Sequence, residues 1–182
     1  MPIVFEKAPQ EVRELLQLVI QEHHRDLADA NVNVGVLMQT KIDNDDNEIP
    51  SLKCHGAMAN AVIKVVSRKD RTHRNEDSEI VVDAVIWKTL SEKCKRALLD
   101  HELTHLVVKR DRKTQKFALD DLNRPRLAMI PDDFTLTGFL DVVRRNGDAA
   151  LEYQSVARVH FAVMEAATQA GKKVAEEMAA AS

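Results

Sequence analysis

The sequence is poor in cysteine, lacks long apolar runs and carries little net charge. Its two cysteines, Cys54 and Cys94, form no CxxC pair in 182 residues, which excludes a disulfide scaffold and favours a reducing, cytoplasmic setting. No stretch approaches the roughly 18 consecutive apolar residues of a membrane-spanning helix, and residues 1–8 lack the apolar run of a signal peptide. The formal net charge of -3 gives no overall attraction to nucleic acid or to an anionic membrane.

The rest of the composition is that of a globular protein with a core. Hydrophobic residues make up 45% of the chain and charged residues 30%. We detect no internal repeats. The length suits one compact domain, which we predict over residues 1–165, followed by a helical C-terminal tail over residues 166–182 whose end we expect to fray.

The hydrophobic pattern alternates between helical and extended segments and predicts an α+β fold. Extended patterns cover residues 31–42, 59–67 and 79–82, and a short hairpin is expected over residues 107–119. Helical periodicity covers residues 9–30, 91–108, 134–145 and 148–181, with Ser91 as an N-cap and Asn146-Gly147 as a helix stop. We expect a small antiparallel or mixed sheet of about three or four strands, packed on the helix over residues 91–108 and joined by N-terminal and C-terminal helices.

The motif that carries chemistry is His101-Glu102-Leu103-Thr104-His105, inside the helix predicted over residues 91–108. Positions i and i+4 lie one above the other on a helix, so both imidazoles can bind one zinc ion. In an HExxH motif the glutamate takes a proton from the metal-bound water and does not bind the metal. We therefore predict His101 and His105 as zinc ligands and Glu102 as general base. The alternative is an amphipathic helix that carries two histidines by chance.

Metal-binding histidines also need acceptors for their second ring nitrogens, and we expect Asp100 or a loop carboxylate to serve. A third ligand must come from another segment and leave one position open for water. Asp132 and Asp133 stand at the start of a predicted helix, where they can bind a metal or cap the helix. Glu152 and His160 lie farther downstream, with a solvated charge and a packed or surface histidine as their alternatives.

Other polar residues near the motif have less specific patterns. His23 and His24 are adjacent and cannot share a helix face, so we expect both on the surface. Tyr153, Arg144 and Arg145 are candidates to stabilise an oxyanion, although the two arginines equally suit the C-terminal end of a helix.

Three charged segments suggest other partners. Residues 43–50 are acidic but lack the ligand positions and central glycine of an EF-hand, so we expect a solvated turn. Residues 68–78 (RKDRTHRNEDS) and 110–116 (RDRKTQK) are rich in cations. They predict either solvated loops or a basic contact for an acidic partner such as nucleic acid.

The residues around the motif resemble the phage metallopeptidases, a family of small HExxH proteins from phages and prophages. The resemblance covers roughly residues 10–160, and its most specific parts are RALLDHELTHL (96–106), LNRPRL (122–127), and Asp132-Asp133-Phe134. The family pattern has His-Asp-Phe at this triplet, so the resemblance implies a third ligand at Asp132, with Asp133 and Glu152 as alternatives. The chain is also similar to minimal zincins such as the SprT-like and ImmA-like proteins, which implies a few strands beside an active-site helix.

These observations support three functions. The first is a zinc metalloendopeptidase in the cytoplasm of a bacterial host, with a protein or peptide substrate added as a strand along a sheet edge. The second is a catalytically weak zinc-binding regulator or anti-defence module, which the aspartate at position 132 favours. The third is nucleic-acid contact through residues 68–74 and 110–116, which the acidic net charge disfavours. The sequence predicts no membrane partner and no oligomeric state.

Overall fold

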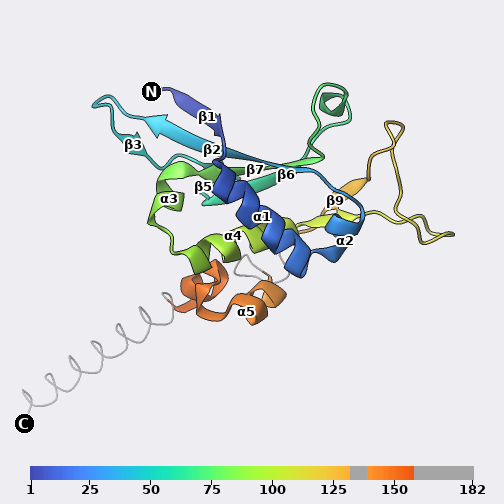
Figure 1. Cartoon of the computed structure of the whole chain (residues 1–182). Helices are drawn as coiled ribbons and strands as arrows, with labels where there is room; N and C mark the ends of the chain where they lie inside the picture. The colour runs from blue at the N-terminus through green and yellow to red at the C-terminus, as the bar shows by residue number, and fades with distance from the viewer. Residues whose placement is uncertain (132–138, 158–182) are drawn as a thin grey trace, which may run out of the picture.

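A mixed sheet forms one layer of the fold, and helices cover one of its faces (Figure 1). The computed structural model describes residues 1–131 and 139–157. The strand order is β1-β2-β7-β6, with short β3 on the end of β2; β2 and β7 are parallel and the other pairs are antiparallel. The predicted α+β class with a mixed sheet is confirmed. The strands are β1 (Ile3–Lys7), β2 (Val34–Ile42), β3 (Glu48–Ile49), β6 (Ala61–Val65) and β7 (Ser78–Asp83).

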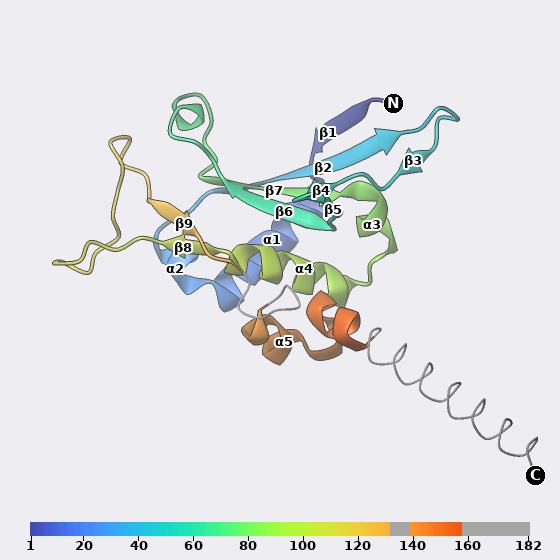
Figure 2. The same cartoon turned by 180° about the vertical axis from the view of Figure 1, so that it is seen from behind.

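The core lies between this sheet and two helices, α1 (Gln10–His23) and α4 (Glu92–Thr104). Alternate residues of the central strand β7, Ile80 and Val82, are fully buried, because a strand places every second side chain on the same face. They belong to one apolar cluster with Leu16 of α1 and Leu99 of α4. Figure 2 shows the same two-layer arrangement from behind. The fold therefore holds α4 rigidly against the sheet.

The helix predicted over residues 9–30 is interrupted at His24, which separates α1 from α2 (Arg25–Asp29). His24 leaves the helical conformation with φ -123° and ψ 57°. The interruption has a tertiary cause, since the His24 side chain contacts Asp100 in α4.

The helix of the motif begins as predicted, with the Ser91 side chain accepting a hydrogen bond from the Cys94 amide. It ends at Thr104, earlier than predicted, because Leu106–Val108 form β8 and pair with β9 (Leu127–Met129). The hairpin expected over residues 107–119 is therefore part of a longer projection, closed by a bridge between Arg110 and Phe117.

The remaining elements are short. Helix α3 (Ala84–Thr89) connects β7 to α4, and α5 (Leu140–Asn146) ends at Gly147, whose φ of 56° confirms the predicted helix stop. Residues 151–157 are helical, as predicted for the start of the last helix. The hairpin β4 (Lys53–Cys54) and β5 (Ala57–Met58) and the 3₁₀ turns η1 (Asp70–Thr72) and η2 (Gly147–Ala149) complete the list.

Some predictions fall outside the described residues, namely the start of the helix over residues 134–145 and the domain boundary after residue 165. None of the helices in residues 1–131 and 139–157 has the length and hydrophobicity that crossing a bilayer requires.

The strands β1, β3, β4, β5 and β9 were not predicted from the sequence, and β1 is the longest of them. Residues Ile3–Lys7 form β1, which pairs antiparallel with β2. All five side chains are exposed, so the segment lacks the contrast between buried and exposed positions that signals a strand. Its stability comes from pairing with a partner strand more distant in the sequence.

Candidate metal centre

The last turns of α4 carry the HExxH motif, and the apolar face of the helix anchors it. Leu98, Leu99 and Leu103 are at most 2% exposed and pack into the core. On the same helix the rings of His101 and His105 have their centroids 5.1 Å apart. The i, i+4 spacing thus brings the two imidazoles side by side.

Each imidazole is held at its Nδ1 atom. The Nδ1 of His101 lies 2.6 Å from Oε1 of Glu152, and the Nδ1 of His105 lies 2.8 Å from the carbonyl oxygen of Ile130. A carbonyl and a carboxylate can only accept, so both Nδ1 atoms carry the proton and donate. The lone pair of each neutral ring is then on Nε2, as in metal-binding histidines whose other nitrogen donates to an oxygen.

Glu152 supports His101 from the side opposite to Nε2. Its side chain is buried, and Oε1 also accepts from the amide of Phe139 at 3.3 Å. Burial raises the pKa of this carboxyl, but the hydrogen bond from His101 and those from backbone amides lower it below the ordinary value. Glu152, an alternative third ligand, accepts from Nδ1 of His101 through Oε1, while its buried Oε2 has no hydrogen-bond partner among the described residues.

Phe139 forms an apolar wall against the two rings. It is 3% exposed, and its ring centroid lies 5.2 Å from that of His101 and 4.6 Å from that of His105. Sequence reasoning assigned it no role, because nothing in a single phenylalanine indicates which side chains it will touch. Its position restricts water around the imidazoles and limits their rotation.

Glu102 is 5% exposed in α4, next to His101. Asp132, Asp133 and His160, the other candidate ligands, lie outside the described residues. Within residues 1–131 and 139–157 no three histidine, cysteine, aspartate or glutamate side chains are grouped as a metal site. The described part of the candidate centre thus consists of two imidazoles, which are of the ligand type that zinc takes, and a third ligand is expected from residues outside the described ranges.

Comparison with known families supports this interpretation. The family model described as "Putative phage metallopeptidase" matches residues 3–164. The chain belongs to this phage metallopeptidase family. The resemblance noted from the sequence is thereby confirmed; membership suggests a peptidase and implies a metal ion. Neither the curated proteins nor the solved structures yielded a match.

In this chain Asp100 binds side chains outside the motif. Its carboxylate is 1% exposed and accepts hydrogen bonds from His24 at 2.9 Å, Arg145 at 2.8 Å and Asn146 at 2.7 Å. Burial raises the pKa of Asp100, but these bonds and the charge of Arg145 lower it well below the usual range. Of the two kinds of acceptor expected for the motif histidines, Asp100 or a loop carboxylate, Asp100 does not serve at either Nδ1 atom; it joins α4 to the end of α1 and to α5.

The same contacts bear on two further predictions. His24 is not a surface residue, since its side chain is 10% exposed and bound to Asp100. Arg145 donates to Asp100 and, at 3.5 Å, to the Thr104 hydroxyl of the motif, while Arg144 donates to Asp141 in its own helix. Both arginines stand in the last turn of α5, the alternative expected for them. The Asp100 cluster fixes α5, and α5 lies between Phe139 and the helix of Glu152.

A groove of about 590 Å³ lies beside the motif of this family member. One side is formed by residues 22–27 and the other by Leu106–Val108, the strand that directly follows His105. The motif side chains are not among its lining residues. The groove thus adjoins the candidate centre without containing it.

Proposed function

We propose that this protein is a zinc-dependent endopeptidase. His101 and His105 bind the metal through Nε2, and Asp132 is the third ligand, with Asp133 as its alternative. The observation that carries the proposal is the pair of Nδ1 hydrogen bonds, to Glu152 and to the Ile130 carbonyl, which orients both rings for a single ion. Two neutral imidazoles and a carboxylate, with one position left open, are the donor set of catalytic zinc sites.

Glu102 acts as the general base. When bound, zinc lowers the pKa of a coordinated water toward neutrality and polarises the substrate carbonyl. Glu102 takes a proton from the attacking water and returns it to the leaving amine. Phe139 limits access of bulk water to one side of the rings, which strengthens the electrostatic interactions of the site. Glu152 keeps the proton of His101 on Nδ1 throughout.

A polypeptide substrate binds as an added strand along β6. This strand ends the order β1-β2-β7-β6, and it contacts both α4 and β9. The strand at the other edge of the sheet, β1, has no comparable contact with α4 or with β9. Backbone hydrogen bonds along β6 would hold an extended substrate across the motif helix. The groove beside Leu106–Val108 offers space for the part of the substrate beyond His105.

Elemental analysis tests the metal site. Purified wild-type protein is expected to contain about one zinc per chain, because a complete site binds one ion. His101→Ala and His105→Ala should lose it. His73→Ala is the matched control, since His73 is exposed and distant from the motif in the sequence. Absence of zinc from the wild type, or its retention in both motif variants, would contradict the assignment.

Glu102→Gln tests catalysis separately from metal binding. The variant should keep its zinc and lose peptidase activity by about 10²-fold or more, the usual contribution of a general base. Activity is measured on fluorescently labelled, unfolded casein, with cleavage confirmed by mass spectrometry. If wild-type and variant proteins are equally inactive while both hold zinc, the second function, a zinc-binding regulator without catalysis, replaces the first.

Two variants of Glu152 test whether this residue supports His101 or binds the metal itself. Glu152→Ala removes the acceptor of His101 and should weaken zinc affinity by about 10- to 100-fold. Glu152→Gln keeps an accepting oxygen in place and should lose less. Equal, complete loss of zinc in both variants would identify Glu152 as a ligand instead. Zinc affinity is measured by competition with a coloured chelator.

A further inference from the structure

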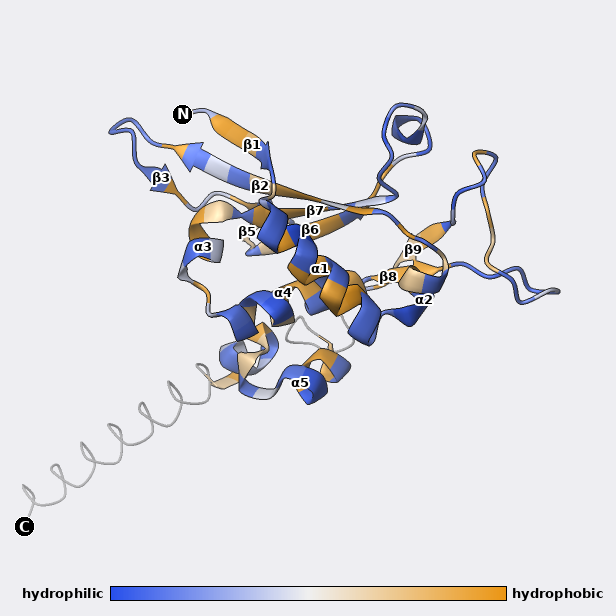
Figure 3. Cartoon of the chain, viewed as in Figure 1, coloured by the Kyte–Doolittle hydropathy of each residue, from blue (hydrophilic) through white to orange (hydrophobic). Residues whose placement is uncertain are grey.

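A projecting arm connects β8 to β9, and it is independent of the metal centre. We define the arm as residues 109–126. It extends away from the body in Figures 1 and 2, and Figure 3 shows that it is mainly hydrophilic. Residues 109–111 are joined to residues 116–118 by the hydrogen bonds from the Asp111 amide to the Lys116 carbonyl and from the Ala118 amide to the Lys109 carbonyl. The arm therefore contains a two-stranded ribbon over residues 109–118, followed by a second turn that the bridge between Leu119 and Pro125 closes.

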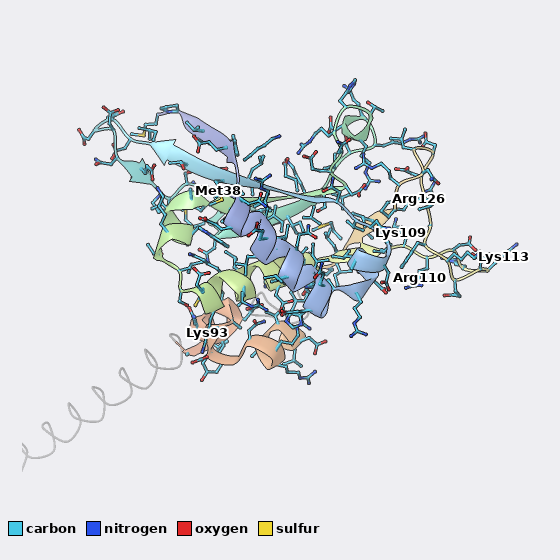
Figure 4. The ribbon with its side chains drawn as sticks, viewed as in Figure 1. Met38, Lys93, Lys109, Arg110, Lys113 and Arg126 are labelled. Atoms are coloured by element: carbon cyan, nitrogen blue, oxygen red, sulfur yellow. The ribbon has the colours of Figure 1, made fainter. Side chains whose placement is uncertain are left out.

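The arm concentrates positive charge in an acidic protein. It contains seven Lys or Arg residues and three Asp residues, a net charge of +4, which leaves -7 for the rest of a chain whose total is -3. The total net charge of the chain does not reveal this uneven distribution. Figure 4 labels four of these cations, Lys109, Arg110, Lys113 and Arg126, on or at the base of the arm.

The three carboxylates of the arm are already engaged. Asp111 accepts hydrogen bonds from the backbone amides of Lys113 and Thr114 and so closes the turn at the tip. Asp120 is bound by Arg71, and Asp121 by Arg68. Two of the three are thus neutralised by cations from outside the arm, and none of them forms an ion pair with a cation of the arm.

Most cations of the arm, in contrast, have no carboxylate partner within residues 1–131 and 139–157. Arg110 pairs with Asp26, and Arg124 with Asp77. The five others are exposed and appear in no ion pair of the described residues: Lys109, Arg112, Lys113, Lys116 and Arg126. Long flexible side chains that lie along a ribbon and carry uncompensated positive charge are suited to binding a linear polyanion.

We propose that the arm binds the phosphate backbone of double-stranded DNA without sequence preference. A two-stranded ribbon fits the width of the major groove, whose rims carry phosphates on both sides. Nonspecific binding needs cations placed to reach phosphates and needs no base-reading side chains. An acidic protein partner would rather require apolar anchors at the centre of the contact. Arg112 and Lys113 occupy the turn of the ribbon over residues 109–118, and the exposed Leu119 and Leu122 lie outside this ribbon, in the second turn.

The five cations set a quantitative expectation. Each neutralised phosphate contributes about -0.9 to the slope of log K against log salt concentration, so five contacts give about -4.5. Removing three of them should leave a slope of about -1.8. The slope counts contacts, which a general effect of net charge does not reproduce.

The test uses the full chain and a fluorescent 20-base-pair DNA duplex of arbitrary sequence. Anisotropy titrations from about 50 to 200 mM salt compare wild type with the triple variant Arg112→Gln, Lys113→Gln and Lys116→Gln. The matched control is Arg13→Gln, Lys53→Gln and Lys93→Gln, which removes the same charge from exposed positions outside the arm. Circular dichroism verifies that both variants are folded.

We expect the slope of log K against log salt concentration to become less steep in the arm variant and to stay unchanged in the control. Equal weakening in the two variants would overturn it in favour of a net-charge effect, and absence of wild-type binding at 50 mM salt would overturn it outright. A polyglutamate peptide is titrated in parallel. Binding to polyglutamate as tight as binding to the duplex at the same salt would assign the arm to an acidic protein.

Discussion

Two basic segments of this protein look alike in the sequence and differ in the structure. Residues 68–74 and residues 109–116 each contain several cations within a short polar stretch. In the first segment Arg71 is 7% exposed, and Arg68 and Arg74 are paired with carboxylates. In the second segment only Arg110 has a carboxylate partner among the described residues. Cation content alone therefore does not indicate a binding surface.

The difference lies in which carboxylates each segment can reach. Arg71 donates to Asp120 and to the carbonyl oxygens of Pro125 and Asp77, so it joins its own loop to the base of the arm. Arg124 completes this connection from the other side by donating to Asp77 at 2.8 Å. Arg71 thus supports the base of the arm, and Lys69 is the one Lys or Arg of residues 68–74 that is exposed and in no ion pair of the described residues. The expectation of nucleic-acid contact stays a prediction for residues 68–74, and for residues 110–116 it is developed into the proposal for the arm.

Of the changes that test this comparison, replacing Arg71 should have the largest effect on the free energy of unfolding. Arg71→Met removes a buried cation and leaves Asp120 without its partner, and we expect a loss of about 3 kcal/mol in the free energy of unfolding. Arg112→Met, the matched change in the arm, should alter it by no more than about 0.5 kcal/mol. Urea denaturation of both variants measures the difference. Similar losses in the two variants would show that the segments are energetically equivalent.

A smaller, pH-dependent effect is expected at Glu79, which is buried and paired with Lys64 and Arg74. Burial raises the pKa of this carboxyl, but the hydrogen bonds and charges of its two partners lower it overall. A lowered folded-state pKa contributes stability above the unfolded pKa of about 4.3, and this contribution is lost as the pH falls through the folded value.

Glu79→Gln should therefore be less stable than wild type at pH 7, by about 1 kcal/mol, since bonds to charged groups are replaced. The gap between the two proteins should narrow as the pH falls below about 4.3. Urea denaturation at pH 7, 5, 4 and 3.5 follows it. A gap that stays constant or widens in acid would mean that the ionised form of Glu79 is not the one favoured by folding.

The smallest effect on the free energy of unfolding is expected for the ion pair of Arg68 and Asp121, whose side chains are 73% and 54% exposed. Exposed ion pairs gain little, because water and salt screen the charges. The double-mutant cycle of Arg68→Ala and Asp121→Ala should show no measurable coupling in urea denaturation at 0.5 M salt. A coupling that persists at this salt concentration would place Arg68 in the scaffold beside Arg71.

Local patterns allowed the longer helices and three strands of the main sheet to be predicted. The extended segments around β2, β6 and β7, the N-cap at Ser91 and the stop at Gly147 depend on residues close in the sequence. The end of α4 was placed too late, because apolar residues such as Leu106 continue the helical pattern into β8. Their strand conformation depends on pairing with Leu127–Met129, which lie 19 to 23 positions farther along the chain and outside any local pattern.

The sequence by itself determined the family and the relative placement of His101, Glu102 and His105, because a helix sets the geometry of residues one turn apart. Only the tertiary structure decided which groups accept hydrogen bonds from the Nδ1 atoms of those histidines. Glu152 reaches His101 from 51 positions away, and Asp100, next to the motif in the chain, turns to His24 and Arg145 instead. Ring orientation and charge compensation depend on which distant groups packing brings within hydrogen-bond distance, and no local pattern encodes that choice.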